Sequence, residues 1–100
     1  MTKQPKKHPP YTEWGVLQTT YLEDDSEIVD EEELSGTIKN EKEARKVFAA
    51  EVKSAEESGL SSDEGERVEI ELKQWDYEWN EEEKDYYIAD EFVADYKIFP

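Results

Sequence analysis

The chain has 100 residues, no cysteine, and 28 acidic residues against 12 basic ones, which gives a formal net charge of −16 at pH 7. This length allows one hydrophobic core and no second domain. The lack of cysteine excludes a disulfide framework and a thiolate metal site, and it favours a cytoplasmic protein. The charge argues against direct binding to nucleic acid or to an anionic membrane, because carboxylates repel phosphate groups.

The first ten residues are basic. Lys3, Lys6 and Lys7 lie among three prolines, and no apolar side chain follows Met1, so we expect residues 1–10 to be a disordered tail. The tail lacks the apolar run of a signal peptide, and no stretch of the chain has the ~20 apolar residues of a membrane span. Folding should therefore begin near Tyr11, and residues 11–100 should form a single acidic domain.

Three segments between the tail and residue 40 differ in composition. Residues 12–22 are rich in β-branched and aromatic residues, which predicts a strand. Residues 23–33 hold eight carboxylates in eleven positions, which predicts a loop or an exposed edge because such a segment repels itself. Residues 34–38 predict a short strand, in which Gly36 allows a bulge.

Residues 41–58 are predicted to form a helix. Asn40 is a favourable N-cap, Glu43 stands at the capping-box position, and Gly59 is placed to end the helix. The apolar positions repeat at helical spacing and predict the face that packs on a sheet: Ala44, Phe48, Val52 and Ala55, with Val47 at the edge.

Residues 67–80 give the strongest strand pattern in the chain. Their apolar residues change parity halfway: Val68, Ile70 and Leu72, then Trp75, Tyr77 and Trp79. A bulge near Lys73 and Gln74 would bring both sets to one face of the sheet, whereas an unbroken strand would place them on opposite faces. The pattern leaves both arrangements open.

The last segment completes a C-terminal hairpin. Its apolar residues alternate on one face, interrupted by Asp90: Tyr86, Ile88, Phe92, Ala94, Tyr96 and Ile98. The elements then follow the order β(β)αββ. We therefore predict an α+β fold, in which an antiparallel sheet of three or four strands carries one helix packed on one face.

No residue set points to catalysis. The only histidine, His8, lies in the tail, where nothing fixes its geometry against a nucleophile. Asp90 is a candidate for a buried carboxyl with a raised pKa, although an aspartate at a sheet edge is the simpler interpretation. The acidic run lacks the glycine of an EF-hand loop, and the four glycines are isolated. We expect a non-enzymatic protein with no metal site and no cofactor.

Two features predict a surface that binds a protein. The aromatic triplet Trp75, Tyr77 and Trp79 either covers hydrophobic surface or forms a platform, for which a protein-binding hot spot is favoured over a sugar site. Carboxylates at alternate strand positions, such as Glu69 with Glu71 and Asp76 with Glu78, are spaced by roughly 6.7 Å, close to the separation of successive phosphates.

The leading hypothesis is an acidic protein that docks on a basic protein surface, including the possibility of a nucleic-acid mimic that inhibits a DNA- or RNA-binding protein. The alternative is a structural module that self-associates, for example as a homodimer, through its sheet, with the acidity serving solubility alone. The candidate partner-binding residues are Glu23, Asp24, Asp25, Glu27, Asp30, Glu31, Glu32, Glu33, Glu69, Glu71, Trp75, Asp76, Tyr77, Glu78 and Trp79.

Overall fold

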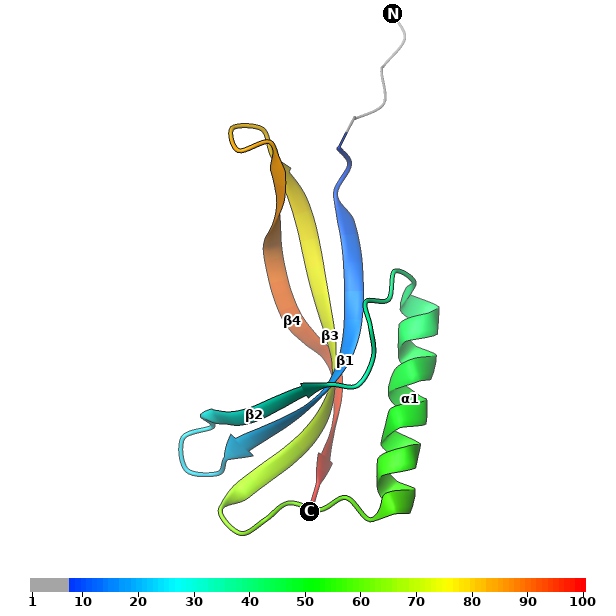
Figure 1. Ribbon diagram of the computed structural model, residues 1–100, viewed down its shortest axis with the longest axis vertical. Helices are drawn as coiled ribbons and strands as arrows, with labels where there is room; N and C mark the ends of the chain where they lie inside the picture. Colours follow the sequence, from blue (N-terminus) through cyan, green and yellow to red (C-terminus); the bar gives the residue numbers. More distant parts are fainter. Residues whose placement is uncertain (1–7) are drawn as a thin grey trace, which may run out of the picture.

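The computed structural model describes residues 8–100 and contains four strands and one helix. In chain order these elements are β1 (Tyr11–Leu22), β2 (Ile28–Glu33), α1 (Glu41–Ser58), β3 (Glu66–Asn80) and β4 (Asp85–Phe99). The strands form one antiparallel sheet in the order β2-β1-β3-β4, and α1 lies along one side of it (Figure 1). The predicted α+β fold is confirmed, with the sheet in its four-stranded form. The predicted tail falls mostly on residues 1–7, outside the described residues.

The helix begins and ends where its capping residues predict. The Asn40 side chain accepts a hydrogen bond from the Glu43 N–H at 3.0 Å. At the other end Gly59 adopts a left-handed backbone with φ 78°, and the Leu60 N–H donates to the Ala55 carbonyl. Only glycine adopts this conformation without steric cost, so α1 stops after Ser58.

The acidic run takes the exposed-edge alternative, whereas the short strand predicted at residues 34–38 does not form. The structure places β2 at Ile28–Glu33, within the acidic run, and pairs it with the end of β1. Residues 34–38 are not a strand: there the Leu34 N–H donates to Val16, and Ile38 forms an isolated bridge to Trp14. Every residue of β2 is exposed. Carboxylates are accommodated in β2 because all six side chains reach water, so their charges stay hydrated.

A single core fills the space between α1 and the sheet. Its buried members are Val16, Ala44, Ile70, Leu72 and Phe99, and the predicted helix positions Val47, Phe48, Val52 and Ala55 pack around them. The helical stripe is therefore confirmed as the face that meets the sheet. β1 and β3 lie at the centre of the sheet, so their apolar residues supply most of the buried surface.

The parity change within β3 is resolved in favour of the unbroken strand. Leu72 pairs with Asp95 and Lys73 with Val93, so the extra residue at this register shift is Ala94, which lies on β4. Because β3 continues without an extra residue, Leu72 faces α1 and the aromatic triplet lies on the opposite side of the sheet. We call that side, which α1 does not cover, the open face.

The register shifts also divide the apolar residues of β4. A second shift makes Ala89 an extra residue, because Asp76 pairs with Asp90 and Tyr77 with Ile88. The prediction that Phe92 shares a face with Tyr96 is therefore wrong. Phe92 pairs with Gln74 and lies on the helix side of the sheet, whereas Val93 joins the open face.

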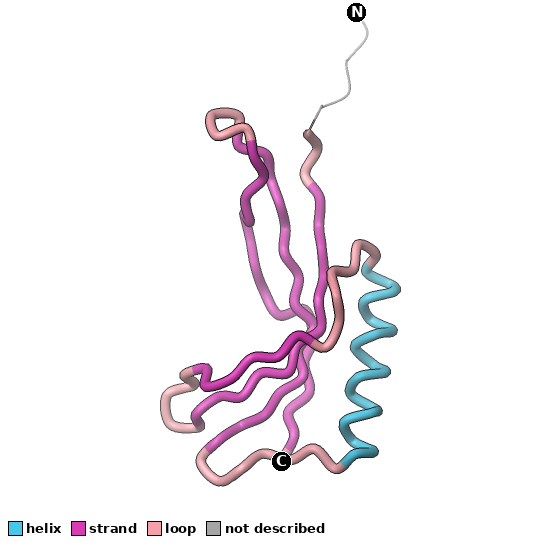
Figure 2. Tube along the Cα trace, viewed as in Figure 1, coloured by secondary structure: helices cyan, strands magenta, loops and turns pink. Residues whose placement is uncertain are grey.

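The sheet is longer than the helix that covers it. The ends of β3 and β4 nearest their connecting turn extend past the start of α1, together with the beginning of β1 (Figures 1 and 2). The molecule is accordingly elongated, with principal extents of 63 × 28 × 17 Å. The projecting end of the hairpin has no helix against it and depends on contacts among its own side chains.

Candidate functional site

A buried carboxylate lies at the centre of the open face. Glu71 is 3% exposed, and its two oxygens accept hydrogen bonds of 2.7 Å from the Thr19 and Tyr21 hydroxyls. Burial, followed by the hydrogen bond to Glu71, raises the pKa of the Tyr21 hydroxyl well above its ordinary value. The Arg67 guanidinium lies over the Tyr21 ring, 4.9 Å from its centroid. The cluster is fully hydrogen-bonded within the protein.

Two of the candidate partner-binding residues, Glu69 and Glu71, are buried and paired within the protein. Glu71 is enclosed by β1, and Glu69 is 8% exposed and accepts a 2.7 Å hydrogen bond from Arg67 Nε. Their carboxylates have the predicted spacing along β3, but they face internal partners. The prediction that Glu69 and Glu71 present phosphate-like charge is therefore wrong, because Glu71 bonds to two hydroxyls of β1 and Glu69 is paired with Arg67 of its own strand.

The Tyr21 hydroxyl also makes the free energy of unfolding decrease at alkaline pH. Because its pKa is higher in the folded chain than in the unfolded one, its contribution is complete below pH ~10 and is lost as the pH rises above that value. We expect Tyr21→Phe to flatten the fall in unfolding free energy between about pH 10 and 12, measured by urea denaturation. An unchanged slope in Tyr21→Phe would contradict this assignment.

Lys73 links the two edges of the sheet across the open face. Its ammonium lies 3.6 Å from Glu31 on β2 and 3.5 Å from Glu91 on β4. The lysine side chain is only 15% exposed, whereas both carboxylates are about half exposed. Lys73 therefore partly neutralises Glu31, and the remaining acids of β2 and its preceding turn carry the free charge.

The free acids gather at the β2 edge. All eight carboxylates of residues 23–33 are exposed, and they lie on one strand edge and the turn before it. Of the predicted pair on β3, Glu78 is exposed, whereas Asp76 is partly buried and accepts hydrogen bonds from Thr12 and Gln74. The structure thus brings the acidic loop residues together at one edge and leaves Glu78 apart from them.

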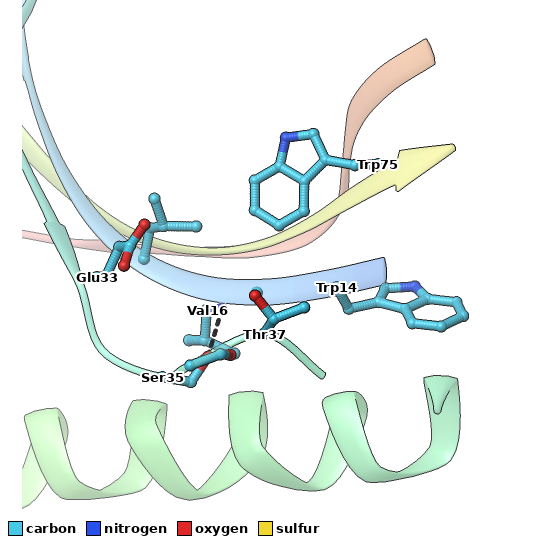
Figure 3. A pocket seen from close by; sticks show the side chains of 9 residues that line it. Trp14, Val16, Glu33, Ser35, Thr37 and Trp75 are labelled. Carbon is cyan, nitrogen blue, oxygen red and sulfur yellow. Dashed lines mark hydrogen bonds between the residues drawn. The ribbon is translucent and has the colours of Figure 1, made fainter. Parts of the chain in front are cut away.

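The first aromatic of the triplet is a packing residue. Trp75 lies on the side of β1 away from α1 (Figure 3), and its ring would be 3.0 Å from a Cβ placed on Gly15. A small pocket of about 30 Å³ lies beside it, lined by Trp75, Glu33 and residues 14–17 and 35–37. That volume holds about one water molecule. Trp75 therefore covers the backbone of β1, as the simplest interpretation of the triplet predicts.

The other two aromatics belong to a stack at the projecting end of the hairpin. Tyr77 stacks on Tyr11 with ring centroids 4.7 Å apart, and Trp79 stacks on His8 at 3.6 Å. Tyr86 meets Tyr11 and Trp79 edge-on, and its hydroxyl donates to the Pro9 carbonyl. His8 and Pro9, assigned to the tail, thus lie against the hairpin. These contacts hold β1 to the hairpin beyond the helix.

The largest exposed apolar surface follows β4, which the candidate set did not include. Of the nine large hydrophobic residues that are exposed within residues 8–100, six lie on this strand: Tyr87, Ile88, Phe92, Val93, Tyr96 and Ile98. By register, four of them lie on the open face, 41–57% exposed, and we call Ile88, Val93, Tyr96 and Ile98 the β4 row. The sequence shows that apolar residues alternate in residues 86–98, but it does not show that their side chains are exposed.

Asp90 is exposed on the edge strand, as the simpler interpretation of that residue predicted. Within residues 8–100, no three His, Asp or Glu side chains are grouped so as to hold a metal ion. In the same residues, no helix is both long and apolar enough to cross a membrane.

The fold and this surface define a small, single-domain α+β protein with one uncovered sheet face. No protein-family model matches the chain, and no curated protein or solved structure shows significant similarity to it. Its function must therefore be argued from its own surface.

Proposed function

We propose that this protein is a non-enzymatic binding protein that docks on a basic surface of a protein partner. The observation that carries the proposal is the β4 row, a line of exposed apolar side chains on a chain with a net charge of −16. On this face Glu91 lies between Ile88 and Val93, so the apolar surface is continuous only from Val93 through Tyr96 to Ile98. Isolated exposed hydrophobic residues are ordinary, but neighbouring ones on one strand face are typical of an interaction surface. The charge selects a partner of opposite sign.

The two surface features have different roles in this proposal. The exposed carboxylates of residues 23–33 attract a basic partner over a distance and raise the association rate. The β4 row then excludes water at the contact and slows dissociation, because a few desolvated side chains, tyrosine prominent among them, supply most of the binding energy of an interface, and apolar neighbours keep water out. Charge without an apolar row would give binding that salt readily disrupts.

The finer form of the proposal is that the partner's basic surface is a nucleic-acid-binding groove. Eight exposed carboxylates along one edge and its turn support it, because they offer a dense line of negative charge like that of a phosphate backbone. Fewer carboxylates support this form than the sequence analysis expected, because Glu69 and Glu71 are buried.

Self-association is the second candidate, and the free edge of β4 favours it. An unpaired strand with exposed apolar residues is a template for pairing with a second copy. Against this stands the repulsion between two chains that each carry a net charge of −16. Sedimentation at low and high salt separates the two, because a self-associating chain should form dimers as salt screens this repulsion.

The proposal is tested on an array of purified basic and acidic proteins, including nucleic-acid-binding ones. We expect binding to basic proteins, competition by duplex DNA, and a Kd that rises at least about tenfold between low and moderate salt. Neutralising Asp24, Asp25, Asp30 and Glu32 to the amides should slow association by about tenfold and change dissociation little. Binding that ignores the charge of the arrayed protein would overturn the proposal.

A further inference from the structure

We propose that the outer edge of β4 accepts an extended basic segment of the partner as a fifth strand of the sheet. This inference rests on the proposed function for the sign of the partner's charge. It adds the mode of recognition, which is backbone pairing along an edge, and the pattern of the segment, in which basic and apolar residues alternate.

The first argument is the outer edge of β4, which no other described strand pairs with. The strand has 15 residues and ends the sheet order β2-β1-β3-β4, so within residues 8–100 it pairs with β3 alone. The N–H groups of Tyr86, Glu91 and Tyr96 each donate to the side chain of the preceding aspartate, so an added strand that used them would have to replace these local hydrogen bonds. β2, the opposite edge, has six residues, so β4 offers the longer template.

The second argument is the arrangement of side chains along β4. The β4 row lies on the open face, where α1 does not cover it. The stretch from Asp95 to Phe99 pairs with β3 without a register shift, so its outer edge is a regular strand over five residues. Tyr96 and Ile98 lie there, 57% and 45% exposed. An added strand would place alternate apolar side chains beside them.

The third argument is the charge of β4, which favours a basic segment of a partner over a second copy of this chain. β4 holds four acidic residues, Asp85, Asp90, Glu91 and Asp95, and one lysine, Lys97. Asp90 and Asp95 are exposed, so lysine or arginine on an incoming strand would find opposite charge along the edge. Asp90 supplies this charge more directly, because the Asp95 carboxylate already lies 3.9 Å from the Arg45 guanidinium. A second copy would bring the same excess of acids, because two β4 strands carry like net charge. The charge of β4 therefore disfavours pairing with the β4 strand of a second copy and favours pairing with a basic strand.

The probe for this proposal is a synthetic peptide of about ten residues in which lysine alternates with valine. Two matched peptides accompany it: one with glutamate in place of lysine, and one N-methylated at alternate residues so that it cannot pair through one edge. Binding is measured by titration, and the bound site is mapped by hydrogen exchange of the full chain, because a paired edge protects its amides.

The proposal predicts that the lysine peptide binds and slows exchange in β4, and that N-methylation weakens binding at least about tenfold. The double variant Tyr96→Ala and Ile98→Ala should weaken it by a similar factor. The matched double variant Ile28→Ala and Val29→Ala, which changes equally exposed residues on β2, should not.

Four results would overturn the proposal: no binding of the lysine peptide, equal binding of the N-methylated peptide, equal binding of the glutamate peptide, or protection outside β4. Dimers whose own β4 amides are protected would also overturn it, in favour of a second copy. If basic proteins on the array still bind when the peptide does not, strand addition fails while the proposed function stands.

Discussion

Replacing Leu72 with alanine is expected to lower the free energy of unfolding by about 3 to 4 kcal/mol. Leu72 is fully buried between β3 and α1, in contact with the core that Val16, Ala44 and Ile70 form. The truncation removes buried methyl groups and leaves a cavity that the β-strands cannot close. Equilibrium urea unfolding, followed by tryptophan fluorescence, measures the change.

The matched control for Leu72 lies on the other side of the same sheet. Val93→Ala changes an aliphatic residue that is 41% exposed on the open face, and it should cost less than about 1 kcal/mol. A loss as large as that of Leu72→Ala would show that the open face is buried in solution. That result would contradict the division of the sheet into a covered face and an open one.

Replacing Glu71 with alanine is expected to cost about 3 kcal/mol. The change leaves the buried Thr19 hydroxyl and the Tyr21 hydroxyl without their acceptor, and each lost hydrogen bond to a charged group is worth roughly 1.5 to 3 kcal/mol. Glu71→Gln should lose less, because the amide oxygen still accepts one hydrogen bond. Thermal and urea unfolding of both variants measure the difference.

Glu78 provides the comparison for Glu71 on the same strand. Its side chain is exposed and faces the other side of β3, so Glu78→Ala should leave stability within about 0.5 kcal/mol of the wild type. If Glu71→Ala were as mild as Glu78→Ala, the carboxylate of Glu71 would be free to meet a partner. The assignment of Glu71 to the interior would then fail.

The helix and the main hairpin were predictable because their signals are local. Asn40 and Gly59 define the ends of α1 through backbone geometry that depends on a few neighbouring residues. The alternation in residues 67–80 likewise shows a strand wherever it lies. These elements can be predicted from the sequence because their patterns depend on neighbouring residues and not on contacts with distant segments.

The positions of β2 and of the two register shifts were not predictable in the same way. Residues 28–33 have a composition that is unfavourable for a strand. They form an exposed strand because β1 offers a free edge there. The first shift falls between Leu72 and Lys73, where a bulge was considered, but its extra residue, Ala94, and that of the second shift, Ala89, lie in β4, because a bulge belongs to a pair of strands and either strand can hold it. The parity of β4 changes as a result.

The candidate site was partly predictable for the same reason. The exposure of residues 23–33 follows from their composition, because so many carboxylates cannot be buried together. Glu69 and Glu71 are also acidic, but the pairing of β1 with β3 brings the Thr19 and Tyr21 hydroxyls to Glu71, and Arg67, two residues earlier on β3, pairs with Glu69. The exposure of the β4 row depends on α1 lying on the opposite face, which the sequence of β4 does not encode.

The most direct test of the proposed function is the dissociation rate of the complex with a basic partner from the array, compared between two double variants. Tyr96→Ala with Ile98→Ala should speed dissociation by at least about tenfold with little change in the melting curve, because both side chains are exposed in the free protein. Ile28→Ala with Val29→Ala should leave the rate unchanged. Equal rates for the two double variants and the wild type would contradict the assignment of the β4 row as the docking surface.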